Sequence, residues 1–339
     1  MREIGSALYA FMDKYLFTVT GRADGSSKLA QGHKWGFFPS AAIAWRVTEE
    51  GFLKDNSVIN NLKLRLSYGE SGNNAVDNYS TILGTSSTQY DFDGTNANGQ
   101  YLNRIKNDKL GWEKSKEINL GLDFAFWGGR LAGNVELYNK KTYDLILSQK
   151  IPQTNGFDNV GAVNVGATRN KGLEIGLNTV NIQTKDFSWT TNLSFATNKN
   201  EITEIFGDSK DYPDQKLFIG QPVLVHYDYA WDGIWQTSEK DEASKYGRLP
   251  GAVKEVDQDN SGTITPDSII LRDGRPETVV FRNGLSHTFT YKDFDFSVFI
   301  YTRQGEMKWS KFHTELQNEY LGEINQLKVD YWTPENPSN

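Results

Sequence analysis

The chain has 339 residues, a formal net charge of -7 and no cysteine. A net negative charge, with no cluster of Lys and Arg residues visible in the sequence, argues against a nucleic-acid partner. No run of about eighteen apolar residues is present, which excludes transmembrane helices. The aromatic content of 13% is high, and the mean hydropathy of -0.58 is compatible with a membrane barrel, because half of each strand would face water.

From the N-terminus onward, apolar and polar residues alternate in stretches of about ten residues. The clearest stretches begin near residues 15, 62, 117, 131, 173, 187 and 294. In the stretch 187–198, the apolar residues Trp189, Leu193 and Phe195 all have odd numbers. A period of two places them on one face of a strand. The pattern predicts about ten strands of about nine to eleven residues, the length that crosses a bilayer when tilted.

The connections between the strands are alternately short and long. Short turns are expected near residues 13–14, 127–130, 181–186 and 291–293, and long connections at 23–34, 70–115, 148–167 and 201–278. Residues 47–61 form a connection at the end of the strands where short turns are expected, but they carry an apolar-polar stretch that predicts a helical turn. Long loops on one side are typical of an outer-membrane barrel. We therefore predict an all-β fold, an antiparallel transmembrane β-barrel with long extracellular loops.

The two ends of the chain carry neither an apolar leader with a cleavage site nor a final strand. Residues 331–337 have the composition of turns and loops. We therefore expect residues 1–339 to be one partial barrel domain that begins and ends inside a larger barrel.

Several segments, in order along nearly the whole chain, resemble those of the SusC/RagA-type TonB-dependent outer-membrane transporters. They are 22–27 (RADGSS), 34–40 (KWGFFPS), 62–69 (LKLRLSYG), 71–73 (SGN), 110–113 (LGWE), 119–123 (NLGLD) and 170–174 (NKGLE). The ordered combination is far more specific than any one of these motifs.

The resemblance implies a barrel of 22 strands in the cell outer membrane, with a signal peptide and a plug domain that are absent from this chain. It also implies nutrient uptake, with a SusD-like lipoprotein and the TonB system as partners and an oligosaccharide or peptide as substrate. Among the polar positions of the strands, we expect Arg65, Asp123, Glu136 and Glu174 to face the wet interior, while the apolar face meets outer-membrane lipid.

One segment has the spacing of a calcium loop. Its oxygen-bearing residues are Asp257, Asp259, Ser261, Thr263 and Asp267, with Gly262 at the sharp turn. The segment resembles one in the transporter family, but the bidentate Glu of an EF-hand is replaced by Ser268. A structural Ca²⁺ site and a surface loop of Asx-turns both remain open. No cofactor is required.

No motif predicts an enzyme. The histidines have no zinc-binding spacing; they are His33, His226, His287 and His313. The residues around Ser71 do not have the spacing of a nucleophile elbow. We interpret Glu49 and Glu50 as solvated turn residues.

An aromatic cluster in the long connection after residue 200 consists of Tyr227, Tyr229, Trp231 and Trp235. These rings are candidates for ligand binding, because aromatic faces stack on sugars and contact partner proteins. The competing interpretation is that they extend a strand above the membrane and belong to its aromatic belt.

Two other classes of protein share part of this pattern. A secreted soluble β-sandwich that binds glycans with a calcium loop would also alternate apolar and polar residues. A non-transporting barrel such as an adhesin would share the strands but not the ordered segments.

Overall fold

The computed structural model describes residues 1–54, 56–150, 154, 159–208, 210–265, 269–276, 280–308, 310–316, 328 and 330–338. The chain divides into two compact units, of which the first is Met1–Val223 with Val279–Gln304 and the second is Leu224–Thr278 with Gly305–Asn339. Within the described ranges, no helix has the length and apolar character needed to cross a membrane.

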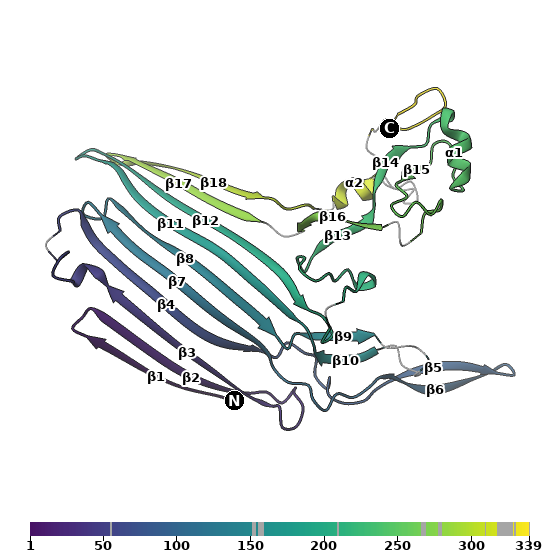
Figure 1. Ribbon diagram of the computed structural model, residues 1–339, viewed down its shortest axis with the longest axis horizontal. Helices are drawn as coiled ribbons and strands as arrows, with labels where there is room; N and C mark the ends of the chain where they lie inside the picture. The colour runs from purple at the N-terminus through teal and green to yellow at the C-terminus, as the bar shows by residue number, and fades with distance from the viewer. Residues whose placement is uncertain are drawn as a thin grey trace. The chain divides into compact units, whose positions relative to one another are not determined.

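Ten strands of the first unit form one antiparallel sheet, and their order in the sheet follows their order along the chain (Figure 1). The strands are β1 (Arg2–Phe11), β2 (Tyr15–Gly25), β3 (Trp35–Arg46), β4 (Ile59–Asn73), β7 (Glu113–Phe126), β8 (Leu131–Tyr143), β11 (Ala167–Gln183), β12 (Phe187–Glu204), β17 (Phe281–Tyr291) and β18 (Phe294–Gln304). The predicted antiparallel meander of about ten strands is confirmed.

The register of the sheet sorts apolar and polar side chains onto opposite faces. One row across neighbouring strands consists of Phe17, Ile43, Leu66, Leu120, Leu137 and Leu173. Phe17, Leu66 and Leu120 are exposed, so this face needs an apolar environment to cover it. A barrel wall in a membrane provides that environment.

Several strands are longer than the sequence predicted. β4 has 15 residues, β11 has 17 and β12 has 18, so each is longer than the bilayer-spanning minimum of about nine to eleven residues. The long connections also contain strand pairs of their own, which the sequence analysis missed. In the first unit these are β5 (Gly84–Phe92) with β6 (Thr95–Arg104) and β9 (Ile146–Lys150) with β10 (Asn159–Asn164).

Short turns occupy one end of the sheet, which we call the turn side, and the long connections occupy the other, the loop side. The β7–β8 turn has three consecutive residues with positive φ, namely Trp127, Gly128 and Gly129, a conformation that glycine adopts without steric cost. The β11–β12 turn is shorter than predicted, because β11 continues to Gln183. The other short turns lie where the sequence placed them.

The predicted helical turn between β3 and β4 is a 3₁₀ helix, η1 (Val47–Glu49). The next residue, Glu50, joins this connection to the β1–β2 turn. Its carboxylate accepts hydrogen bonds from Lys14 Nζ at 2.8 Å, the Tyr15 hydroxyl at 2.8 Å and Trp45 Nε1 at 3.1 Å. These donors, with Lys14 as the largest cause, lower the pKa of Glu50 to about 2.

Glu50 should make the stability of the turn side depend on pH. Because the folded pKa of about 2 lies below the unfolded value of 4.5, the stabilisation is complete above pH 4.5 and disappears as the pH falls through 2. We expect Glu50→Gln to lower the melting temperature at pH 7 and to match the parent near pH 2. Thermal unfolding between pH 7 and pH 2 measures this difference.

Glu49→Gln is the control, because the Glu49 ion pair with Arg46 is more exposed to solvent and such pairs contribute little. A gap between Glu50→Gln and the parent that stays constant down to pH 2 would contradict the assigned role.

A buried apolar cluster of the first unit lies at the loop side of the sheet. We call it the loop-side core; its members are Leu29, Ala30, Phe38, Val76, Leu110 and Trp112. The rings of Phe38 and Trp112 meet edge to face with centroids 5.5 Å apart, and the Arg22 guanidinium lies 5.3 Å from the Phe38 centroid. This cluster ties together strands β2, β3, β4 and β7 where they enter the loops.

The second unit is built from short elements. They are β13 (Val225–Tyr229), β14 (Trp231–Ile234), η4 (Thr237–Glu239), α1 (Lys240–Lys245), β15 (Val253–Glu255), β16 (Ile269–Pro276) and α2 (Lys311–Leu316). β13 pairs with β16 and β14 with β15. The C-terminal segment joins this unit through Trp332, whose Nε1 donates to Gln236 at 2.9 Å and whose ring lies against Gly251.

Candidate functional site

The polar face of the sheet carries a charge cluster formed by Lys63, Arg65, Asp123 and Glu136. Arg65 binds Asp123 through two nitrogens, at 2.9 Å and 2.8 Å, and also binds Glu136. Lys63 Nζ lies 3.4 Å from Asp123. The cluster joins β4, β7 and β8 by side-chain bonds in addition to the backbone ladder.

Gly121 makes room for this arrangement. A Cβ added at Gly121 would lie 2.7 Å from the central carbon of the Arg65 guanidinium, so the guanidinium lies directly over the glycine. Glu174 on β11 is the register partner of Glu136. The sheet therefore brings all four predicted interior residues onto one face, and Arg65 is bonded to two of them.

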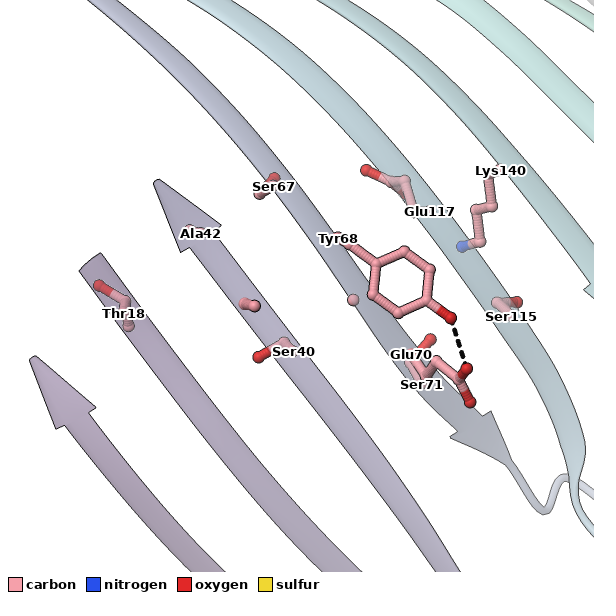
Figure 2. A pocket seen from close by; sticks show the side chains of 12 residues that line it. Thr18, Ser40, Ala42, Ser67, Tyr68, Glu70, Ser71, Ser115, Glu117 and Lys140 are labelled. Carbon is pink, nitrogen blue, oxygen red and sulfur yellow. Dashed lines mark hydrogen bonds between the residues drawn. The ribbon is translucent and has the colours of Figure 1, made fainter. Parts of the chain in front are cut away.

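A shallow depression of about 320 Å³ lies on the same face toward the loop side. Its small lining residues are Thr18, Ser40, Ala42, Ser67, Ser71 and Ser115. Glu117 and Lys140, which are register partners on β7 and β8, also line it. Figure 2 shows the depression across β2, β3, β4, β7 and β8, with the Tyr68 hydroxyl donating to Glu70 at 2.5 Å. Hydroxyls, the carboxylates of Glu70 and Glu117 and one ammonium equip it to hydrogen-bond a polar ligand.

The segments that carry the family resemblance converge on the loop-side core. Trp112 Nε1 donates to the Lys34 carbonyl at 3.2 Å. A Cβ at Gly36 would lie 2.5 Å from the Phe38 ring and a Cβ at Gly72 only 2.1 Å. Glycine is therefore required beneath the ring in two separate segments. These segments hold the bases of two long loops, between β2 and β3 and between β4 and β7, in fixed positions.

The calcium-like loop is closed by its own hydrogen bonds. Asp257 accepts from the backbone of Ser261 at 3.2 Å and of Gly262 at 2.8 Å. A hydrogen bond shared with Asp257 lowers the pKa of Asp259. The Ser261 hydroxyl donates to the carbonyl of Thr263 at 2.9 Å. Asp267 lies outside the described residues, and among those described no three His, Cys, Asp or Glu side chains gather into a metal site. The Ca²⁺ site stays a prediction.

Isothermal titration tests the calcium prediction. Binding should saturate with a dissociation constant of about 10⁻⁴–10⁻³ M, as in extracellular modules, and Asp257→Asn should remove the heat. Asp241→Asn, in the first turn of α1, is the control that should leave it unchanged. Absence of binding at millimolar calcium would overturn the prediction.

The four candidate aromatic residues lie in the second unit, three of them on two strands and Trp235 directly after the second. Tyr227 and Tyr229 belong to β13, and Trp231 to β14. The interpretation that they extend a barrel strand is wrong, because both strands pair within their own two-stranded sheets. Trp235 is buried at 4% exposure, whereas Trp231 is 58% exposed.

Trp235 belongs to the core of the second unit. It stacks on Tyr246 with centroids 6.0 Å apart, and Lys254 Nζ lies 4.7 Å from its ring. Trp231 is therefore the tryptophan of this pair that a ligand can reach. Its role in binding stays a prediction.

The contacts of the other residues that were considered for catalysis or metal binding are structural. Ser71 lines the depression, and Glu50 is held by three donors in the turn. His287 accepts hydrogen bonds on the apolar face. The sequence analysis missed the depression because it depends on which small residues become neighbours across strands. The only signal was a set of serines at the polar positions of successive strands.

Comparison with known proteins agrees with this architecture. The family model described as "TonB dependent receptor-like, beta-barrel" matches residues 5–266. TonB-dependent receptor P26 of Formosa agariphila is 35% identical over 99% of this chain and 35% of its own length. TonB-dependent receptor SusC of Bacteroides thetaiotaomicron is 35% identical over 86% of this chain and 30% of its own. The chain thus spans about a third of the length of these relatives.

Among solved structures, the RagAB peptide transporter superposes with a TM-score of 0.80 at 23% sequence identity, covering 99% of this chain and 37% of that one. This match and the single meander with an exposed apolar face overturn the alternative of a soluble β-sandwich, in which two sheets pack face to face. The antiparallel sheet described above is therefore barrel wall, and this chain belongs to the TonB-dependent receptor-like β-barrel family as a SusC/RagA-type member.

Proposed function

We propose that this chain is part of the barrel wall of a TonB-dependent importer in the cell outer membrane. The importer would take up oligosaccharides or other large nutrients such as peptides, with a SusD-like lipoprotein as partner and TonB as the source of energy. The family consists of transporters and receptors, not enzymes.

The observation that carries this proposal is the sorting of side chains between the two faces of the sheet. The apolar face has exposed rows such as Phe17, Leu66 and Leu120, which suit lipid. The opposite face carries the ion-paired charge cluster and the hydroxyl-lined depression, which suit a wet lumen that a polar nutrient crosses.

The partners and the substrate class are inferred from the relatives. SusC is described as a TonB-dependent receptor, and the RagAB complex is described as a peptide transporter. The long loop-side connections, whose bases the loop-side core fixes, offer a surface on which a lipoprotein lid could sit. Hydroxyls both donate and accept hydrogen bonds, so the depression fits either a sugar or a peptide.

Uptake by cells tests the proposal. The complete protein should fractionate with the outer membrane, and cells should lose uptake of its nutrient when either TonB or the neighbouring SusD-like lipoprotein is deleted. A protein that stays in the soluble fraction, or uptake that survives loss of TonB, would overturn it.

Trp231 should contribute to ligand affinity if its exposed ring stacks on the nutrient. Because such stacking contributes about 1 kcal/mol, we expect Trp231→Ala in the complete transporter to weaken binding about fivefold. Trp127→Ala is the matched control, because Trp127 has a similar exposure of 56% but lies in the β7–β8 turn. Titration of each variant with the nutrient measures the effect, and unchanged affinity would remove the binding role.

A further inference from the structure

Four polar side chains lie in a hydrogen-bonded row on the apolar face of the sheet, close to the turn side. We call this row the outer-face polar chain; its members are Thr179, Asn181, Thr191 and His287. The Thr179 hydroxyl donates to Asn181 Oδ1 at 2.9 Å, and Asn181 Nδ2 donates to Thr191 Oγ1 at 2.6 Å. Thr191 Oγ1 lies 2.9 Å from His287 Nδ1. These residues occupy the face that carries the aliphatic and aromatic side chains.

The bonding pattern fixes the tautomer of His287. The indole Nε1 of Trp189, which can only donate, bonds His287 Nδ1 at 3.3 Å. Thr191 already accepts from Asn181, so its own proton is free to point at the same nitrogen. Nδ1 is therefore an acceptor in the neutral ring, and the proton lies on Nε2. Within the described residues, Nε2 has no hydrogen-bond acceptor.

Aromatic rings surround this donor on the same face. Trp189 stacks on Phe289 with centroids 5.6 Å apart, and Phe289 stacks on Phe296 at 6.2 Å. Rings with a polar edge at this level of a barrel are typical of the interface between headgroups and acyl chains. His287 precedes the end of β17 by four residues, a rise of about 14 Å along the tilted strand.

Cationic side chains lie at the neighbouring turns. Arg130 donates to the backbone carbonyl of Asn181 at 3.1 Å, so its guanidinium lies beside the outer-face polar chain. Lys292, in the β17–β18 turn, lies over the Tyr291 ring at 5.4 Å. Lys185 and Asp186 lie in the β11–β12 turn and Asp293 follows Lys292, so the three cations and two carboxylates leave a net positive charge. A neutral or anionic acceptor on the outside suits these residues better than a cation.

From these contacts we infer that the outer-face polar chain binds one phospholipid of the periplasmic leaflet. The His287 Nε2 proton is donated to a phosphate or ester oxygen of the lipid. The rings of Trp189 and Phe289 pack against the glycerol and the first acyl carbons, and Arg130 and Lys292 lie at headgroup level. This inference rests on the proposed function, since only a membrane brings lipid to this face.

Native mass spectrometry of the complete transporter, purified in mild detergent and supplied with phosphatidylethanolamine, tests the inference. Because one hydrogen bond is lost, His287→Phe should retain about five- to tenfold less lipid than the parent. His287→Gln, which keeps an N–H donor, should retain more than His287→Phe. Thr288→Val is the matched control, because Thr288 is the next residue on the opposite face, and it should retain as much as the parent.

Equal lipid retention by His287→Phe and the parent would overturn the inference. If His287→Phe does not assemble, ¹⁵N spectra of the histidine rings in the parent replace it. A proton on Nε2 whose signal shifts when the lipid is added is expected, and a proton on Nδ1 or no shift would contradict it. A protein absent from the outer membrane would refute the proposed function, whereas a membrane protein with unchanged lipid retention refutes the lipid site alone.

Discussion

Replacement of Phe38 by alanine should lower the free energy of unfolding of the complete transporter by about 3–5 kcal/mol. Phe38 is only 2% exposed, and its ring lies against Trp112 and over Gly36 and Gly72. The rigid backbone beneath the ring cannot collapse into the space that alanine would leave, so the cavity persists. Denaturant unfolding followed by tryptophan fluorescence measures the change.

Phe52→Ala is the matched control for this experiment. Phe52 is 74% exposed in the connection between β3 and β4, so its truncation removes few contacts and should cost under about 1 kcal/mol. Equal effects of the two substitutions would mean that the loop-side core does not stabilise the strands.

Replacement of Arg65 by methionine should destabilise the barrel by about 2 kcal/mol. The substitution removes the partner that Asp123 and Glu136 share, and two carboxylates then remain close together. Breaking a fully buried pair costs about 3–5 kcal/mol. The side chains of Arg65 and Asp123 are 30% and 26% exposed to solvent, so water screens part of their attraction. The same unfolding measurement applies.

Arg169→Met provides the comparison for Arg65→Met. Arg169 pairs with Glu201 at 3.0 Å and is 39% exposed, and exposed pairs contribute about 0–1 kcal/mol. A loss for Arg65→Met no larger than that for Arg169→Met would show that the charge cluster does not hold β4, β7 and β8 together.

The barrel strands were predictable because a membrane imposes a simple rule on them. Each strand must present apolar residues to one side and polar residues to the other, and this period of two is visible in the sequence. The alternation in 117–126 predicted β7, and the alternation in 187–198 predicted most of β12. The ends of these strands continue beyond the apolar pattern, which is why their lengths were underestimated.

The contents of the long connections were not predictable in the same way. Tyr227, Tyr229 and Trp231 alternate as in one strand, but the chain changes pairing partner at Ala230 and divides into β13 and β14. Partners such as β16 and β15 are distant in sequence, and alternation carries no information about pairing across such a distance. The strand extension was therefore inferred wrongly.

The candidate sites depend on register, which the sequence does not reveal. Alternation placed Arg65, Asp123 and Glu136 on the polar face, but their contacts became known only when β4, β7 and β8 were aligned. His287 was considered only as a metal ligand, because its place beside Trp189 and Thr191 depends on the pairing of β12 with β17.

Site-directed spin labelling along β4 and β7 tests the central claim, that the apolar face of this sheet meets lipid and the polar face meets water. The chain has no cysteine, so single labels can replace Leu66, Ser67, Asn119 and Leu120 in turn within a cysteine-free form of the complete protein in bilayers. We expect labels at Leu66 and Leu120 to collide with oxygen dissolved in lipid, and labels at Ser67 and Asn119 to collide with a water-soluble nickel complex. Equal accessibility at all four positions, or the reverse assignment, would contradict the claim.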